Sequence, residues 1–278
     1  MNNQASERAI RIVEEIIRRT ACMHYRLNLN EERTPSSTGS KIGGLPYWPA
    51  GKDYPVDEQG NKMLMLMQLN CAEAGLKAPL PEQGMLQWFI SLNPEHMYGC
   101  PGNFAENEAG FKIVYHETIS EQDLPVDVPT HDSVDEALTP VKREVAIDVV
   151  EEDTSMGVSN GHFNHLFFEI VKGITGVDYS GKAWYEYLDN DDCLFFEQHV
   201  GMKRPRHQML GYPVYDQEEV RRDMDTHDVL LFQLASQYSA DNQPLVMWGD
   251  MGNGFVFVNH EDLAARNFSH AYYCWDCG

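Results

Sequence analysis

Apolar residues recur at helical spacing near the start of the chain. Ala9, Val13 and Ile16 lie three or four positions apart, and this pattern predicts an amphipathic helix. We expect this helix to dock on the body of the protein rather than to serve as a partner-binding peptide.

Later apolar runs are short and follow a loop rich in Ser, Thr and Pro at residues 31–39. Such runs, separated by turn residues, are typical of β-strands. They predict strands at residues 63–69, 85–92, 111–115, 145–150, 229–234, 245–248, 255–258 and 271–275. The first two runs are almost continuously apolar, which favours strands that are covered on both faces.

Residues 117–160 differ from the rest of the chain. They contain twelve Asp or Glu residues against only Lys142 and Arg143, a net charge of −10. This composition predicts a solvated acidic connector over 117–160 that includes the one strand at 145–150. Hydrophobic residues interleave with the acids, which argues against a functional acidic tail.

Two parts of the chain carry the same signals in the same order: a Gly-x-Pro turn, a strand ending in Gln-Leu, a glycine and a closing aromatic strand. These positions are Gly44, Pro46, Gln68 and Gly84 in the first part, and Gly211, Pro213, Gln233 and Gly252 in the second. The match predicts an internal duplication, with repeats at about 40–116 and 204–278. Two such units could pack around a pseudo-twofold axis and leave a shared groove.

No flexible Gly/Ser linker separates the repeats, so we expect one compact domain over residues 1–278. Its predicted class is α+β: mostly antiparallel sheet, with internally duplicated β units and an N-terminal helix.

Charge narrows the classes of partner. The 278 residues include 21 Lys or Arg and 43 Asp or Glu, for a formal net charge of −22. A surface this acidic repels phosphate backbones and anionic lipid, so we expect neither nucleic-acid nor membrane binding. The chain also shows no apolar stretch of about 18 residues and no signal peptide at its start, so we expect a cytoplasmic protein with reduced cysteines.

The segment around the first Gly-x-Pro turn is the first candidate site. Gly43 and Gly44 permit backbone angles that other residues avoid, and Pro46 fixes its own φ. The segment is either a rigid loop that presents Lys41 and Trp48 to a partner or a tight turn pinned to the core. We favour the tight turn, because such turn chemistry commonly serves folding alone.

Gln68 and Gln233 lie inside apolar strands. A buried amide needs hydrogen-bond partners, because an unsatisfied group costs about 1–3 kcal/mol. We therefore expect each glutamine to clamp the Gly-x-Pro turn of its own half. A symmetric ligand site is the alternative.

Two carboxylates stand beside tryptophans, in Trp248-Gly249-Asp250 and Trp275-Asp276. Two carboxylates that face each other across a cleft can act as general acid and base. Asp is also an ordinary turn residue, and we favour that role and a non-enzymatic protein.

Metal and cofactor motifs are weak throughout the sequence. Cys274 and Cys277 supply two thiols, whereas a closed zinc site needs four ligands. The spacing of His162 and His165 does not match a zinc peptidase, and the sequence contains neither a phosphate loop nor a dinucleotide fingerprint. We predict no metal and no cofactor. The basic run at 203–207 is either a local anion-binding patch or, as we favour, a counterweight to nearby acids.

Several segments together resemble the YwqG family of bacterial proteins: 40–49, the strand with Gln68, 84–90, 207–213, 230–234, 247–250 and 275–277. The first of these is also similar to programmed cell death protein 2, whose relatives act as dedicated chaperones for a ribosomal protein. The resemblance implies a duplicated protein-binding module. Its candidate binding residues are Lys41, Gly43, Gly44, Pro46, Trp48, Gln68, His207, Gly211, Pro213, Gln233, Trp248, Asp250, Trp275 and Asp276.

From charge and resemblance together we expect a cytoplasmic, chaperone-like protein-interaction module that receives a basic partner protein. One alternative is an immunity protein of a bacterial toxin system, since some YwqG-like proteins are associated with such systems. The other is a small-molecule-binding protein or a hydrolase that uses Asp250 or Asp276 in a groove between the repeats.

Overall fold

The computed structural model describes residues 5–101, 104–105, 110–120, 127–179, 181–201, 207–217, 219, 221, 224 and 226–278. Its helices are α1 Glu7–Thr20, α2 Phe163–Thr175, α3 Trp184–Tyr187, α4 Asn190–His199 and α5 His260–Ala265. Its strands are β1 Cys22–Asn30, β2 Lys41–Ile42, β3 Leu64–Asn70, β4 Met85–Ile90, β5 Phe104–Ala105, β6 Phe111–His116, β7 Val145–Thr154, β8 Gln208–Leu210, β9 Val229–Ala235, β10 Gln237–Tyr238, β11 Pro244–Val246, β12 Asn253–Val258 and β13 Tyr272–Asp276.

Most strands of the described chain form one 11-stranded sheet, in the order β5-β13-β12-β9-β8-β1-β7-β2-β3-β4-β6. Its strand pairs are antiparallel, so the predicted α+β class with a mostly antiparallel sheet is confirmed. Every strand predicted from the apolar runs is present. β3 and β4 are buried along almost their whole length, as their continuous apolar runs indicate.

The middle of the sheet is formed by β1 and β7, which pair over nine positions from Cys22↔Thr154 to Asn30↔Ala146. The strand predicted at 145–150 therefore exists, but it runs on to Thr154 and is central. Because Val145 and Ile147 turn one face of β7 into the main core, part of the acidic stretch predicted as a solvated connector lies inside the fold. The sequence interpretation also missed β1, whose apolar positions alternate with polar ones.

Each central strand pairs with the opposite half of the chain. β1 lies against β8, and β7 lies against β2. From the centre outward, β8, β9, β12 and β13 follow one another on one flank, and β2, β3, β4 and β6 follow one another on the other. The matched sequence signals thus occupy matching places on the two flanks.

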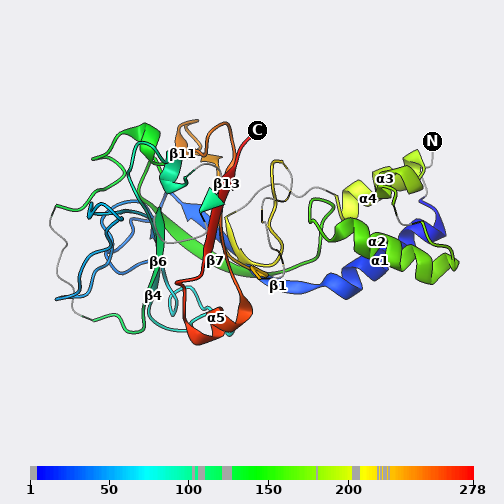
Figure 1. The fold of residues 1–278 in the computed structure, drawn as a ribbon, viewed down its shortest axis with the longest axis horizontal. Coiled ribbons are helices and arrows are strands. Elements are labelled where there is room, and N and C mark those ends of the chain that lie inside the picture. Colours follow the sequence, from blue (N-terminus) through cyan, green and yellow to red (C-terminus); the bar gives the residue numbers. More distant parts are fainter. Residues whose placement is uncertain are drawn as a thin grey trace.

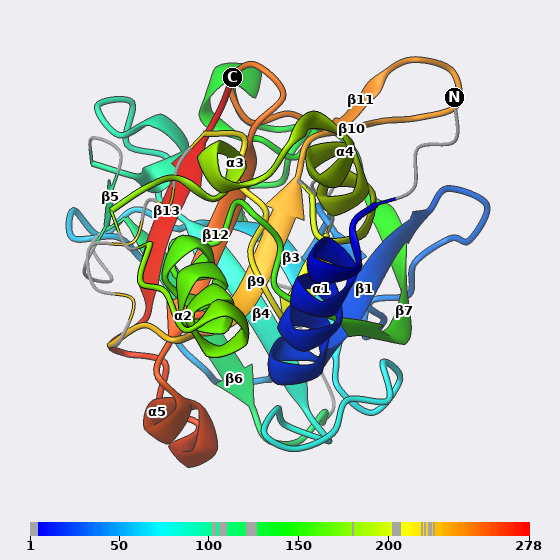
Figure 2. The same cartoon turned by 90° about the vertical axis from the view of Figure 1, so that its right-hand side faces the viewer.

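The helices α1 to α4 gather at one end of the molecule, away from most of the sheet (Figure 1). The predicted N-terminal helix is present, but it packs on α2 and α4 rather than on the sheet. Its buried residues share a core with aromatic residues of the later helices: Ala9, Ile12, Val13, Ile16, Phe163, Phe167, Phe168 and Phe196. We call α1 to α4 the helical unit; Figure 2 shows α1 and α2 side by side in front of the sheet.

Aromatic side chains fill the junction between the two flanks. The ring of Trp88 from the first flank stacks on Phe232 and on Trp248 from the second, with centroids 6.1 and 5.9 Å apart. All three side chains are fully buried. The groove predicted between the repeats is therefore packed with side chains at this level.

No helix among the described residues is both long and apolar enough to cross a membrane.

Candidate functional site

Gln68 clamps the first Gly-x-Pro turn. Its Oε1 accepts the backbone N–H of Tyr47 at 2.7 Å, directly after Pro46. Its Nε2 donates to the carbonyl oxygens of Ser37 and Gly39, at 3.0 and 2.9 Å. Because the side chain is fully buried, these contacts satisfy an amide that would otherwise be costly.

Gln233 does the same on the second flank. Its Oε1 accepts the N–H of Val214, directly after Pro213, at 3.1 Å, and its Nε2 donates to the Val214 carbonyl at 2.9 Å. The clamp predicted for each half is therefore confirmed. We refer to the two arrangements as the glutamine clamps.

The backbone of each clamped turn follows the same path. Gly43 and Gly44 have φ of 62° and 71°, and the corresponding Leu210 and Gly211 have φ of 60° and 67°. A Cβ on Gly43 would lie 2.8 Å from the backbone carbonyl oxygen of Arg143, so that glycine is needed for space as well as for its φ.

Lys41 and Trp48 are both buried. Lys41 is 3% exposed, and its Nζ donates to Glu144 at 2.8 Å. Trp48 is 6% exposed; its Nε1 donates to the Lys52 carbonyl, and its ring meets His116 edge-on. Neither side chain is presented at the surface, which agrees with the tight-turn interpretation.

His207 and Gln208 occupy the matching place on the second flank. His207 Nδ1 accepts the Ala235 N–H at 3.0 Å, and its Nε2 lies 2.7 Å from Gln237 Oε1, so the ring is neutral and donates through Nε2. Burial lowers the pKa of His207 to about 4. Gln208 donates to the Tyr212 carbonyl and lies 3.3 Å from His24 Nδ1.

The four tryptophan and carboxylate candidates divide between core and surface. Trp248 is fully buried against Gly254, and Trp275 packs edge-on against Tyr98. Asp276 is buried and accepts the backbone N–H groups of Asp216 and Asn253. Burial raises the pKa of Asp276, and those hydrogen bonds act in the opposite direction.

Asp250 is exposed and therefore differs from Asp276. The Asp276 carboxylate accepts backbone N–H groups, the capping role favoured from the sequence, whereas the turn role of Asp250 stays a prediction.

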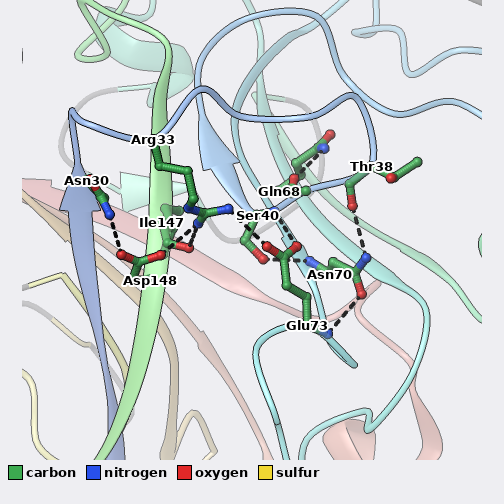
Figure 3. A network of polar contacts seen from close by, with 10 residues as sticks. Asn30, Arg33, Thr38, Ser40, Gln68, Asn70, Glu73, Ile147 and Asp148 are labelled. Atoms are coloured by element: carbon green, nitrogen blue, oxygen red, sulfur yellow. Dashed lines mark hydrogen bonds and ion pairs between the residues drawn. The ribbon is translucent and has the colours of Figure 1, made fainter.

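A polar network ties the loop after β1 to the sheet (Figure 3). Arg33 donates to the Ile147 carbonyl at 2.6 Å and forms ion pairs with Asp148 and Glu73, at 2.9 and 3.1 Å. Glu73 in turn accepts the Ser40 N–H at 3.1 Å. The network fixes the position of the Ser/Thr/Pro loop beside the first glutamine clamp.

A polar cavity of about 300 Å³ lies where the helical unit meets the sheet. His24 and Gln208 line it from the sheet, Asp153 lines it from β7, and Glu197 and His199 line it from α4. His24 is buried, and its Nε2 lies 3.5 Å from Glu152 Oε2.

Metal ligands do not gather in the described part of the chain: no group of three or more His, Cys, Asp or Glu side chains there could hold an ion. Cys274 is fully buried, which raises the pKa of its thiol well above the ordinary value, and Cys277 is half-buried. The basic run at 203–206 lies outside the described residues, and only His207 of that run is placed.

The sequence interpretation missed His24, Gln208, Glu144 and the Arg33 network. Gln208 had a detectable signal, because it stands as far before its Gly-x-Pro turn as Lys41 does before the first one. The other residues had none, since their contacts join segments that are remote in sequence: Arg33 and Ile147, for example, are 114 positions apart.

Comparison with known proteins gives one family. The model of a domain of unknown function, DUF1963, matches residues 40–277. The matched range leaves out α1 and β1, although β1 lies at the centre of the sheet. A search of curated proteins found no match.

Proposed function

This chain belongs to the family of the domain of unknown function DUF1963, and from that premise we propose that it is a non-enzymatic, chaperone-like module that binds a basic partner protein. The resemblance to YwqG-like proteins and to programmed cell death protein 2 supports the protein-binding role. We place the activity in the cytoplasm, in keeping with the expected reduced cysteines.

The filled junction between the flanks is the observation that carries the proposal. The alternative of a small-molecule-binding protein or hydrolase uses a groove between the repeats, and Trp88, Trp248 and Phe232 occupy that space. The filled junction therefore supports a binding function that uses the outer surface.

The negative net charge of the chain favours a basic partner protein. The net charge of −22 raises the local concentration of cationic partners and disfavours acidic ones. Lys41, a basic residue among the candidate binding residues, does not offset this negative charge at the surface, because it is buried in its ion pair with Glu144.

Affinity purification of the tagged full chain tests the proposal, with washes at about 50 mM and about 500 mM NaCl. We expect a basic protein to be enriched at low salt and released at high salt. The control for non-specific ion exchange is an unrelated tagged protein of similar size and similar negative net charge, purified in the same way. If no basic protein is enriched over this control, the proposed function is wrong.

A further inference from the structure

We propose that the outer edge of β7, from Val149 to Asp153, is the docking site for an extended basic segment of the partner, which adds to the sheet as a strand. This inference rests on the protein-binding function proposed above. It specifies the surface that is used and the conformation that the partner adopts. We call these five residues the β7 edge.

The direction of the backbone groups follows from strand alternation. In an antiparallel sheet, successive residues turn their N–H and C=O groups to opposite sides. The Ile147 N–H donates to the Ser40 carbonyl at 2.9 Å, and the Ile147 carbonyl accepts from Arg33, both on the side away from β1. Val149, Glu151 and Asp153 follow at intervals of two and face the same side.

The neighbouring strand stops before it reaches these residues. β2 has only two residues and pairs with Val145 and Ala146 of β7. Beyond Ile147, no hydrogen bond from any other described residue reaches the outer backbone groups of Val149, Glu151 or Asp153. β1 holds the opposite side of β7 along this whole stretch.

The β7 edge is also accessible. Glu151 and Asp153, two of the three residues whose backbone groups face this side, are exposed, and Val149 is half-buried. Figure 2 shows β7 on the outer side of β1, at the right of the view, beside the helical unit. Five residues of strand span about 16 Å, enough for a partner segment of similar length.

The acidic side chains of the β7 edge favour a basic partner segment. Glu151, Glu152 and Asp153 are consecutive, and Lys77 and Arg26 pair with the first two, at 2.6 and 2.9 Å. The described residues give Asp153 no ion pair, and its cavity neighbour Glu197 adds another negative charge.

Such an edge repels an acidic strand, including the same edge of a second copy of this chain. It favours Lys or Arg in an added strand, because cross-strand pairs of opposite charge are stabilising. The added strand would bind through main-chain hydrogen bonds, and the acidic side chains would favour basic segments over acidic ones.

Synthetic peptides of about nine residues test the docking mode. One alternates Lys with Val and Thr; the second has the same side chains but N-methyl groups on alternate residues, which remove its edge-facing N–H donors. We expect the N-methylated peptide to bind at least about tenfold more weakly by titration calorimetry. We also expect the first peptide to slow hydrogen exchange at the Val149, Glu151 and Asp153 amides.

Charge reversal on the protein gives a matched comparison. The double variant Glu151→Lys, Asp153→Lys should lose binding, whereas Glu58→Lys, Glu95→Lys makes the same change in net charge at exposed positions elsewhere and should keep most of it. Hydrogen exchange in β9 and β12 verifies that both variants fold.

The outcomes separate the two proposals. If both peptides bind equally, or both double variants lose binding equally, the docking edge is wrong while the general basic-partner function stands. If the basic peptides do not bind and the purification enriches no basic protein, both proposals are wrong.

Discussion

At the scale of single residues, two buried glutamine side chains need hydrogen-bond partners for every polar atom. Gln68 and Gln233 satisfy that need by accepting the backbone N–H of the residue after a proline. A neighbouring strand would normally accept this N–H, and in each turn the glutamine side chain does so instead. Leucine at either position would fill the volume but leave backbone groups unpaired.

Gln68→Leu and Gln233→Leu should each lower the free energy of unfolding by about 2–4 kcal/mol, because each leaves at least one buried backbone group without a partner. Urea denaturation measures the effect. The control is Gln59→Leu at an exposed position, for which we expect a change within about 0.5 kcal/mol. A loss equal to that of the control would show that the clamps contribute no stability.

His207 should make the fold sensitive to acid. Its pKa of about 4 in the folded protein lies below the ordinary histidine value of 6.5, so the unfolded chain binds more protons between these limits. The free energy of unfolding should therefore fall as the pH falls from 6.5 to 4, by about 3 kcal/mol from this residue.

The measurement is urea denaturation at several pH values, together with an NMR titration of the His207 ring. Burial also lowers the pKa of His116 to about 4, and this acts in the same direction. A His207 ring that titrates near 6.5 in the folded protein would contradict the prediction.

Elements remote in sequence depend on one another in the helical unit. Ser6 caps α1 by accepting the Ala9 N–H, and it also donates its N–H and its Oγ–H to Asp192, both at 2.7 Å. Asp192 is 1% exposed and lies in the first turn of α4. One carboxylate thus joins the start of α1 to α4.

Asp192→Ala should loosen α1 without unfolding the sheet. Each lost hydrogen bond to a buried charge costs about 1.5–3 kcal/mol, so exchange of the α1 amides should accelerate at least about tenfold while β9 and β12 keep their protection. Asp191→Ala changes an exposed carboxylate of the same turn and is the control. Equal acceleration in both variants would exclude the role of Asp192.

Over the whole molecule, negative charge far exceeds positive charge. Exposed ion pairs such as Lys172–Asp178 contribute little to stability, whereas the net charge of −22 repels itself in the compact state.

The midpoint of thermal unfolding should therefore rise by about 2–4 °C between about 20 and 200 mM NaCl, the shift that about 1 kcal/mol produces in a protein of this size. Circular dichroism measures it. A midpoint that falls over this range would mean that screening of the ion pairs outweighs screening of the repulsion.

Local patterns in the sequence were enough to predict the class of the fold, most strand positions, the N-terminal helix and the glutamine clamps. Each of these depends on short-range rules: side-chain alternation, turn residues, and the need of a buried amide for a nearby acceptor or donor. The duplication stays a prediction, which the matched order of strands on the two flanks supports.

Long-range contacts set the remaining features. The pairing of β1 with β8 and of β7 with β2, the union of α1 with α2 and α4, and the open β7 edge all join or expose segments more than 100 positions apart. A strand reveals in its sequence which face is apolar, but its neighbours along the sheet edge are chosen by packing of the complete chain.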